Sequence, residues 1–210
     1  METLESREVL IVPGLWVPGV AMRPFALGLA RRGYVPHIFS YSGRAALGKS
    51  VDALAAVAKD RRLHFLGHSL GGLLVLEALN LHAEVAAASA VLMAAPVRGC
   101  LAGRRLARSA AGRWMLGASL PLWEAGRPAR WTGTAPLGVI AGTRSIGLGR
   151  LLGTYDEPND GVVQLSETVV DGARDQVQLS CAHSEMALSG RAISLAASFF
   201  ATGRFAQGAQ

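Results

Sequence analysis

The sequence is poor in cysteine and in aromatic residues, and it has neither a long apolar run nor a recognisable secretory signal. Each of these features would have indicated a particular class of protein. Only two of its 210 residues are cysteines, Cys100 and Cys181, and their spacing fits neither a metal site nor a disulfide framework, which favours a reducing compartment. Aromatic residues make up 6% of the chain, which argues against a stacking surface for nucleic-acid bases. No apolar run is long enough for a membrane span, and METLESREVL lacks the basic and then apolar regions of a secretory signal. We therefore expect a cytoplasmic protein without a membrane span.

Apolar residues are abundant and follow two alternating patterns. They make up 50% of the chain, which suits one globular domain over residues 1–210. Short apolar runs alternate with longer helical patterns, which indicates βαβ units on a parallel sheet. The expected strands are 9–12, 35–39, 63–66, 88–93, 137–141 and 176–179, and the expected helices are 22–32, 47–58, 70–81 and 190–200. The pattern predicts a three-layer α/β fold with a mostly parallel sheet of about six strands.

The alternation loosens between residues 96 and 135. Within this 96–135 segment, Ala102, Leu106, Ala110 and Trp114 recur every four residues, which favours a short amphipathic helix. We expect the segment to be a cap or lid insertion that lies over the edge of the sheet.

Positive charge also gathers in this part of the chain. The formal charge of the protein is +6, and the segment and its borders carry Arg98, Arg104, Arg105, Arg108, Arg113, Arg127 and Arg130. Such a patch could attract nucleic acid, anionic lipid or an acidic protein, or it could be a solvated surface. We do not expect nucleic acid, because the arginines lie in an apolar segment and the chain has no recognisable nucleic-acid module. Arg104, Arg105, Arg108 and Arg113 are the candidates for an anionic partner.

Ser69 lies within Gly67-His68-Ser69-Leu70-Gly71, between an apolar run and a helical pattern. This is the spacing of a nucleophile elbow, a tight strand-to-helix turn that strains the serine backbone and exposes its hydroxyl. The residues two before and two after the serine must be small, because larger side chains would collide with the neighbouring strand and helix. The alternative is that the glycines only form a tight turn. Because the turn starts a helix whose N–H groups favour an anion, we predict Ser69 to be a nucleophile.

A serine nucleophile needs a base and an acid that orients it, which in a fold with this elbow follow in the order serine, acid, histidine. His183 is the only histidine after His82, and it lies just past the last expected strand, in CAHSEM. His68 adjoins the nucleophile and is expected to pack within the elbow. We predict His183 to be the base; the alternative is an exposed loop histidine.

The acid should lie in a loop after a late strand. Asp160 precedes Gly-Val-Val in TYDEPNDGVVQLSE, so a loop carboxylate is followed at once by a turn that could hold it inward. Asp156 and Glu157 flank Pro158 and are expected to face solvent. We predict Asp160 to be the acid, with Asp171 and Asp175 as alternatives.

The loop after the first strand should supply a second donor for an oxyanion. Pro13-Gly14-Leu15-Trp16 stands in that place, so the N–H of Leu15 would act with the N–H of Leu70. A different winding of the loop would use the N–H of Trp16. The same loop could simply seal a pocket with its apolar side chains.

Taken in order, these motifs resemble the α/β-hydrolase superfamily, in particular its small bacterial lipase- and esterase-like members. The resemblance runs from VPGLWVPGVAMRPFALGLARRGY through GHSLGG and NDGVVQLSET to AHSEMALS and SFFATGRF. It assigns Ser69 as nucleophile, Asp160 as acid and His183 as base, with Leu15 and Leu70 as oxyanion donors. Pro13 departs from the family pattern, because many relatives carry histidine before that glycine to shape the oxyanion loop.

We expect a serine hydrolase that cleaves a carboxylic ester of a small acyl substrate through an acyl-enzyme, with no metal and no cofactor. Trp16, Trp114 and Trp123 are the expected substrate contacts. One alternative resembles the esterases of biotin synthesis, which remove a methyl ester from an acyl chain tethered to acyl carrier protein, an acidic partner for the arginines. A thioesterase is a further alternative. The last is a non-catalytic relative that serves as a binding protein.

Overall fold

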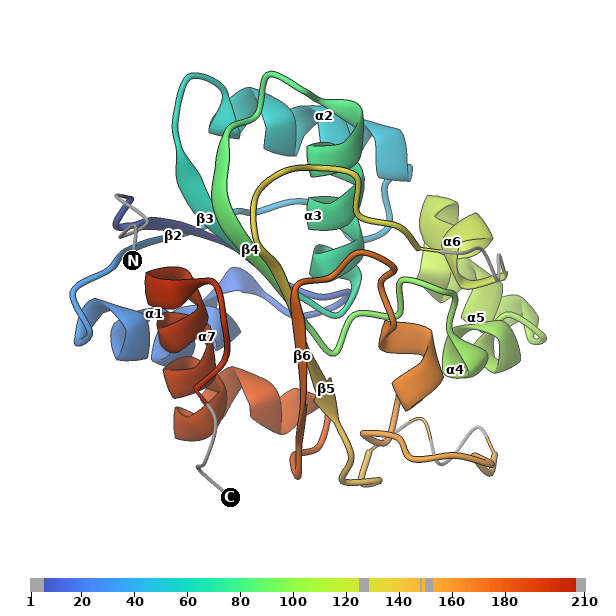
Figure 1. The fold of residues 1–210 in the computed structure, drawn as a ribbon. Helices are drawn as coiled ribbons and strands as arrows, with labels where there is room; N and C mark the ends of the chain where they lie inside the picture. The colour runs from blue at the N-terminus through green and yellow to red at the C-terminus, as the bar shows by residue number, and fades with distance from the viewer. Residues whose placement is uncertain (1–5, 125–128, 148, 150–152, 207–210) are drawn as a thin grey trace.

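The computed structural model describes residues 6–124, 129–147, 149 and 153–206, which form the predicted three-layer α/β fold (Figure 1). At its centre is a six-stranded sheet in the order β2-β1-β3-β4-β5-β6, and every pairing is parallel. The strands are β1 (Glu8–Val12), β2 (Val35–Ile38), β3 (Leu63–His68), β4 (Ala87–Met93), β5 (Leu137–Gly142) and β6 (Asp175–Leu179). The six expected strands are confirmed, with bounds that differ by at most two residues.

Helices cover both faces of the sheet, which explains why its central strands are apolar on both sides. Helices α1 (Arg23–Ala30) and α7 (Gly190–Thr202) pack on one face, and α2 (Leu47–Ala58) and α3 (Leu70–Leu81) pack on the other (Figure 1). Phe25, Phe199 and Phe200 belong to the hydrophobic core under α1 and α7. Leu54 and Leu74 belong to the core under α2 and α3. All six residues of β3 are buried between these layers.

The order of the strands places a crevice at the ends of β1 and β3. The chain runs outward from β1 to the edge strand β2, and then returns past β1 to β3. Helix α1 follows β1 on one face, and α3 follows β3 on the other. In open α/β sheets, ligands bind at the carboxyl ends of the strands at this switch point. The Pro13-Gly14 loop and Ser69 follow these two strands directly.

Within the 96–135 segment, the periodic stretch from Ala102 to Trp114 is divided between two helices where its periodicity suggested one. Helices α4 (Leu101–Leu106) and α5 (Ala110–Leu116) are separated by a turn, and a 3-10 turn (Gly117–Ser119) and α6 (Leu120–Glu124) follow. The Ser109 side chain accepts a hydrogen bond from Gly112 N at 2.9 Å, so it caps α5 and starts a new helix. Residues 125–128, which include Arg127, lie outside the described residues. In the part of the chain that the structure describes, no helix is long and apolar enough to cross a membrane.

Candidate active site

Ser69 stands at the turn between β3 and α3 in a strained backbone conformation, with φ of 53° and ψ of −124°. The glycines two residues before and after Ser69 are needed because neighbouring backbone leaves no room for a β-carbon at either position. A β-carbon on Gly67 would lie 2.4 Å from the Gly72 α-carbon, and one on Gly71 would lie 2.0 Å from the Val12 carbonyl oxygen. The turn therefore has the close approaches expected of a nucleophile elbow.

Asp160 and His183 come together from two loops. Asp160 lies after β5 and is 1% exposed, and its Oδ2 lies 2.8 Å from Nδ1 of His183, which follows β6. Its other carboxylate oxygen accepts hydrogen bonds from the N–H groups of Val162 and Val163, at 2.9 and 2.7 Å. Because an ionised carboxylate only accepts hydrogen bonds, the proton is on Nδ1 and leaves Nε2 of His183 free to accept one.

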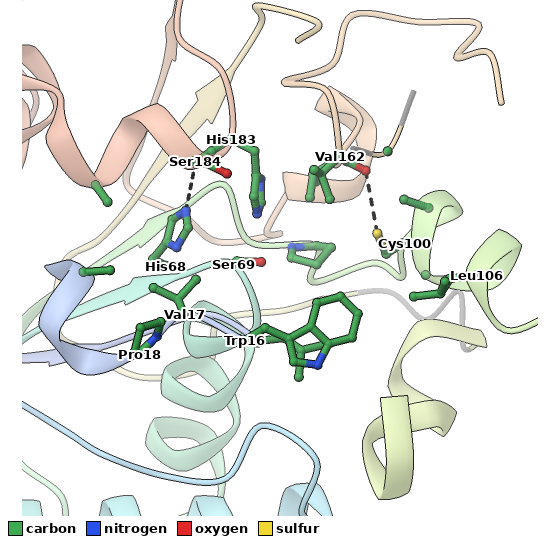
Figure 2. A pocket seen from close by; sticks show the side chains of 18 of the residues that line it. Trp16, Val17, Pro18, His68, Ser69, Cys100, Leu106, Val162, His183 and Ser184 are labelled. Carbon is green, nitrogen blue, oxygen red and sulfur yellow. Dashed lines mark hydrogen bonds between the residues drawn. The ribbon is translucent and has the colours of Figure 1, made fainter. Parts of the chain in front are cut away.

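Ser69 and His183 line the same cavity, which has a volume of about 570 Å³ (Figure 2). No hydrogen bond joins their side chains among the described residues, and such contacts are often longer before substrate binds. Ser69 lies between Val17 and Pro18 on one side and Cys100 and Leu106 on the other. The cavity thus extends in two directions from the serine.

The loop after β1 brings backbone N–H groups to the serine. Gly14 lies so close that a β-carbon on it would be 2.9 Å from Cβ of Ser69. Leu15 and Trp16 follow, and neither N–H has a hydrogen-bond partner among the described residues. Leu70 begins α3, so its N–H has no partner inside the helix. Leu15 and Trp16 line the same cavity as Ser69, and Leu70 follows Ser69 directly in the chain.

Comparison with known families agrees with this geometry. The model of the Alpha/beta hydrolase family matches residues 9–198. The chain belongs to the alpha/beta hydrolase family. No curated protein sequence matches the chain.

Solved structures resemble this alpha/beta hydrolase in fold at low sequence identity. A lipase of Bacillus licheniformis, BlEst2 in its propeptide form, superposes with a TM-score of 0.67 and 16% identity over 87% of this chain and 47% of the lipase. A pyrethroid hydrolase of Sphingobium faniae superposes with a TM-score of 0.64 and 12% identity, over 93% of this chain and 97% of the hydrolase. A lipase-esterase related protein of Clostridium acetobutylicum superposes with a TM-score of 0.61 and 9% identity, over 90% of this chain and 93% of that protein. The chain thus spans about half of the lipase and nearly all of the other two.

His68 packs within the elbow of the hydrolase, as expected from the sequence, and also holds the loop of His183. Its Nε2 lies 3.1 Å from the backbone oxygen of His183, so Nε2 carries the proton and donates it. Nδ1 of His68 is buried without a partner in the described part of the chain. Burial, together with the nearby His183, lowers the pKa of His68 to about 3. His68 is therefore neutral at physiological pH and suited to fixing a backbone rather than to acting as a base.

The three predicted tryptophan contacts lie in different places. Trp16 and Trp123 line the cavity, whereas Trp114 is 69% exposed on the outer face of α5. The guanidinium of Arg44 stacks 4.6 Å from the ring centroid of Trp114 and donates to its carbonyl oxygen. The helix break before Ala110 turns α5 so that Leu116 faces the cavity in place of Trp114.

The predicted arginine patch is partly used within the protein. Arg113 donates to the carbonyl oxygens of Ala107 and Arg108 and so satisfies carbonyls around the break between α4 and α5. The Arg105 guanidinium lies 5.6 Å from the ring centroid of Tyr155, and Arg104 lies 3.9 Å from the carboxylate of Glu167. Arg108 is exposed. These arginines therefore do not form one uniform solvated surface.

Glu167 is a buried carboxylate that sequence reasoning missed. It accepts hydrogen bonds from the N–H groups of Leu101, at the start of α4, and Gln164, so it ties the 96–135 segment to the loop of Asp160. Burial raises its pKa. The spacing of Gln164 and Glu167 is that of a capping box, which was the available signal for this role.

The other candidate acids lie away from the serine. Asp171 pairs with Arg98 at 2.6 Å on the surface, and Asp175 accepts from the N–H of Phe205. Asp156 is exposed, as expected, but Glu157 is half-buried and bonds to Gln164 and Ser166. Across the described ranges, no group of three or more His, Cys, Asp or Glu side chains is arranged to hold a metal ion.

Proposed function

We propose that this hydrolase cleaves a carboxylic ester through a triad of Ser69, His183 and Asp160 and an acyl-enzyme intermediate. The observation that carries the proposal is the 2.8 Å contact between His183 and Asp160 beside a cavity that also exposes Ser69. Asp160 is fixed by two backbone N–H groups, so it can hold the His183 ring in one orientation and one tautomer.

In the proposed reaction, Nε2 of His183 removes the proton of Ser69, and Ser69 Oγ attacks the ester carbonyl carbon. The N–H groups of Leu70 and of Leu15 or Trp16 stabilise the oxyanion that forms. When the carbonyl reforms, the alcohol leaves with the proton held by His183. Water, deprotonated by His183, then attacks the acyl group and releases the acid from Ser69.

The walls of the cavity support a substrate that is apolar and uncharged near the ester. Cys100, Leu106 and Trp123 come from the 96–135 segment, and Val17 and Pro18 lie on the other side of Ser69 (Figure 2). Among the described residues no Arg, Lys, Asp or Glu lines the cavity. A charged group buried there would lose its hydration without gaining a partner, which is costly. The proposed substrate is therefore a neutral ester with an apolar acyl chain.

The proposal is tested first with a fluorophosphonate probe, which reacts only with an activated serine. The wild-type protein should be labelled, and Ser69→Ala should not be. Ser184→Ala is the matched control, because Ser184 lines the same cavity next to His183 and should be dispensable. An unlabelled wild-type protein would support the non-catalytic alternative and overturn the proposal.

Turnover of a panel of esters then defines the substrate. The panel contains p-nitrophenyl esters from acetate to laurate, the matching thioesters, and an acyl methyl ester bound to acyl carrier protein. We expect hydrolysis of the neutral acyl esters by the wild type and by Ser184→Ala, with no turnover by Ser69→Ala. Faster turnover of the thioesters or of the carrier-bound ester would replace the proposed substrate class while leaving the triad in place.

A further inference from the structure

Resting on the proposed function, we propose that Tyr41 is a positioning residue. It holds the loop after β1 (residues 13–18, the oxyanion loop) in the conformation that catalysis needs. Tyr41 lies in the loop between β2 and α2 and does not line the cavity that contains Ser69 and His183. Its hydroxyl donates a hydrogen bond of 2.7 Å to the carbonyl oxygen of Pro13. Pro13 directly follows β1 and precedes Gly14, which touches Ser69.

The Pro13 carbonyl is held from two sides. On one side is Gly71 of α3, where a β-carbon would lie 2.5 Å from the Pro13 oxygen. On the other side is the Tyr41 hydroxyl. The carbonyl of Pro13 and the N–H of Gly14 share one peptide plane, so holding the oxygen also sets where the chain enters the loop. The positions of the following N–H groups, at Leu15 and Trp16, depend on that direction.

The loop has a conformation that needs support. Trp16 adopts a φ of 58°, which is rare for a bulky side chain and persists only where surrounding contacts impose it. The structure describes residues 13–18 in full. Among the described residues, Tyr41 is the one whose side chain forms a hydrogen bond with the backbone of this loop. The backbone adds a bond from Val17 N to the oxygen of Gly14, at 3.3 Å.

Tyr41 is itself well fixed. The ring of Phe39 stacks on it, with the centroids 5.8 Å apart and the planes inclined by 17°. Two residues later, Gly43 packs on Leu15 so closely that a β-carbon would lie 2.7 Å from Cδ1 of Leu15. Burial raises the pKa of Tyr41, so its hydroxyl remains a donor at any working pH. The loop after β2 therefore contacts the oxyanion loop at Pro13 and at Leu15.

This contact affects the transition state more than the substrate complex. The oxyanion develops only as Ser69 attacks, and a donor that is displaced from it weakens stabilisation at that point. Removing an entire donor costs ~10²–10³ in kcat, so misaligning one should cost ~10–100-fold. The Michaelis constant should change little, because the ester itself is held by the cavity walls.

The test is Tyr41→Phe, which removes the hydroxyl and keeps the ring. Tyr34→Phe is the matched control, because the Tyr34 hydroxyl also donates to a backbone oxygen, that of Ala197 at 3.0 Å, on the far side of the domain. With a chromogenic ester that the wild type hydrolyses, we expect Tyr41→Phe to lower kcat ~10–100-fold with KM within about 3-fold of the wild type. A boronic acid, which mimics the tetrahedral intermediate, should bind more weakly by a similar factor, and Tyr34→Phe should match the wild type.

Unchanged kcat and boronate affinity in Tyr41→Phe would overturn the proposal. The proposal would also be overturned if thermal unfolding showed that the fall in kcat of Tyr41→Phe comes from a smaller folded fraction, or if Tyr34→Phe lost as much kcat. Ser69→Ala separates this outcome from failure of the proposed function. If Ser69→Ala is inactive and Tyr41→Phe is normal, only the role of Tyr41 is wrong; if Ser69→Ala retains turnover, the proposed triad is wrong.

Discussion

Gly71 of the elbow helix touches the backbone of Val12 at the end of β1, where a β-carbon on Gly71 would lie 2.0 Å from the Val12 carbonyl oxygen. This contact joins the two segments that flank Ser69, because β1 leads into the proposed oxyanion loop and α3 follows the serine. Gly71 has an ordinary backbone conformation, so it is glycine for lack of space rather than for a positive φ. Ser69 itself takes the strained φ of 53°.

Replacing Gly71 with alanine should destabilise the protein and displace the serine. The new methyl group would meet two backbone oxygens, which can move only if β1 or α3 moves. Overpacking of this kind lowers the free energy of unfolding by ~1–3 kcal/mol or somewhat more. Gly48→Ala is the control, because Gly48 is a helical residue with open space around it, and the free energy should rise by ~0.4–1 kcal/mol. Urea unfolding measures both, and equal effects would contradict the steric account.

Asp160→Asn should greatly reduce turnover while leaving the fold intact. The side-chain oxygen would keep the hydrogen bonds from Val162 and Val163, so the new amide NH₂ would face Nδ1 of His183. An NH₂ group only donates, so the His183 proton would move to Nε2, which could no longer accept the proton of Ser69. We expect kcat to fall by ~10³–10⁴ in steady-state assays. Asp171→Asn, at the surface ion pair with Arg98, should leave kcat unchanged; the reverse result would assign Asp171 as the acid.

Leu106 and Trp114 lie in the same segment but should differ in their effect on substrate choice. Leu106 lines the cavity, so Leu106→Trp should shorten the space for an acyl chain and shift the preferred p-nitrophenyl ester to a shorter one. One methylene in an apolar pocket is worth ~10–200-fold in kcat/KM, so the change should be easy to measure. Trp114→Ala removes an exposed ring outside the cavity and should leave the chain-length profile unchanged. A changed profile in Trp114→Ala would restore Trp114 as a substrate contact.

His64 should make the folded protein less stable in mild acid. Burial lowers its pKa to about 4, and its ring bonds to Ser89 and to the carbonyl of Ser6. Because the unfolded chain binds the proton at a higher pH than the folded protein does, stability falls as the pH drops from the ordinary histidine pKa toward 4. The slope for one such histidine approaches ~1.4 kcal/mol per pH unit.

Urea unfolding between about pH 6.5 and 5, above the range where most carboxylates titrate, measures this slope. His64→Gln removes one titrating group, so it should reduce the slope even though it lowers the overall stability. His68, with its pKa lowered to about 3, keeps its own share of the slope in that variant. An unchanged slope in His64→Gln would show that His64 does not titrate as proposed.

Patterns in the sequence were enough to predict the fold and the tight turn at Ser69. Short apolar runs between helical patterns predicted the six strands, because a strand covered on both faces must be apolar throughout. The glycines around Ser69 predicted the turn, because only residues without a β-carbon fit its close approaches. The order of Ser69, Asp160 and His183 selected three candidates, of which Ser69 and His183 line one cavity and Asp160 lies in hydrogen-bond contact with His183 behind it. Each of these inferences uses spacing along the chain or the conformational limits of a few neighbouring residues.

The contacts between segments far apart in the sequence could not be predicted in this way. The Ser109 cap and the tight packing of Gly112 divide the predicted helix, and this break turns Trp114 to the outside. Glu167 joins the 96–135 segment to the loop of Asp160, and Tyr41 bonds to Pro13 across 28 residues of sequence. A hydrogen bond of this kind forms between groups that the packing of whole helices and strands brings together. Local periodicity does not indicate which distant residue will supply the partner, so the hydrogen bond from Tyr41 to the loop after β1 was visible only in the folded chain.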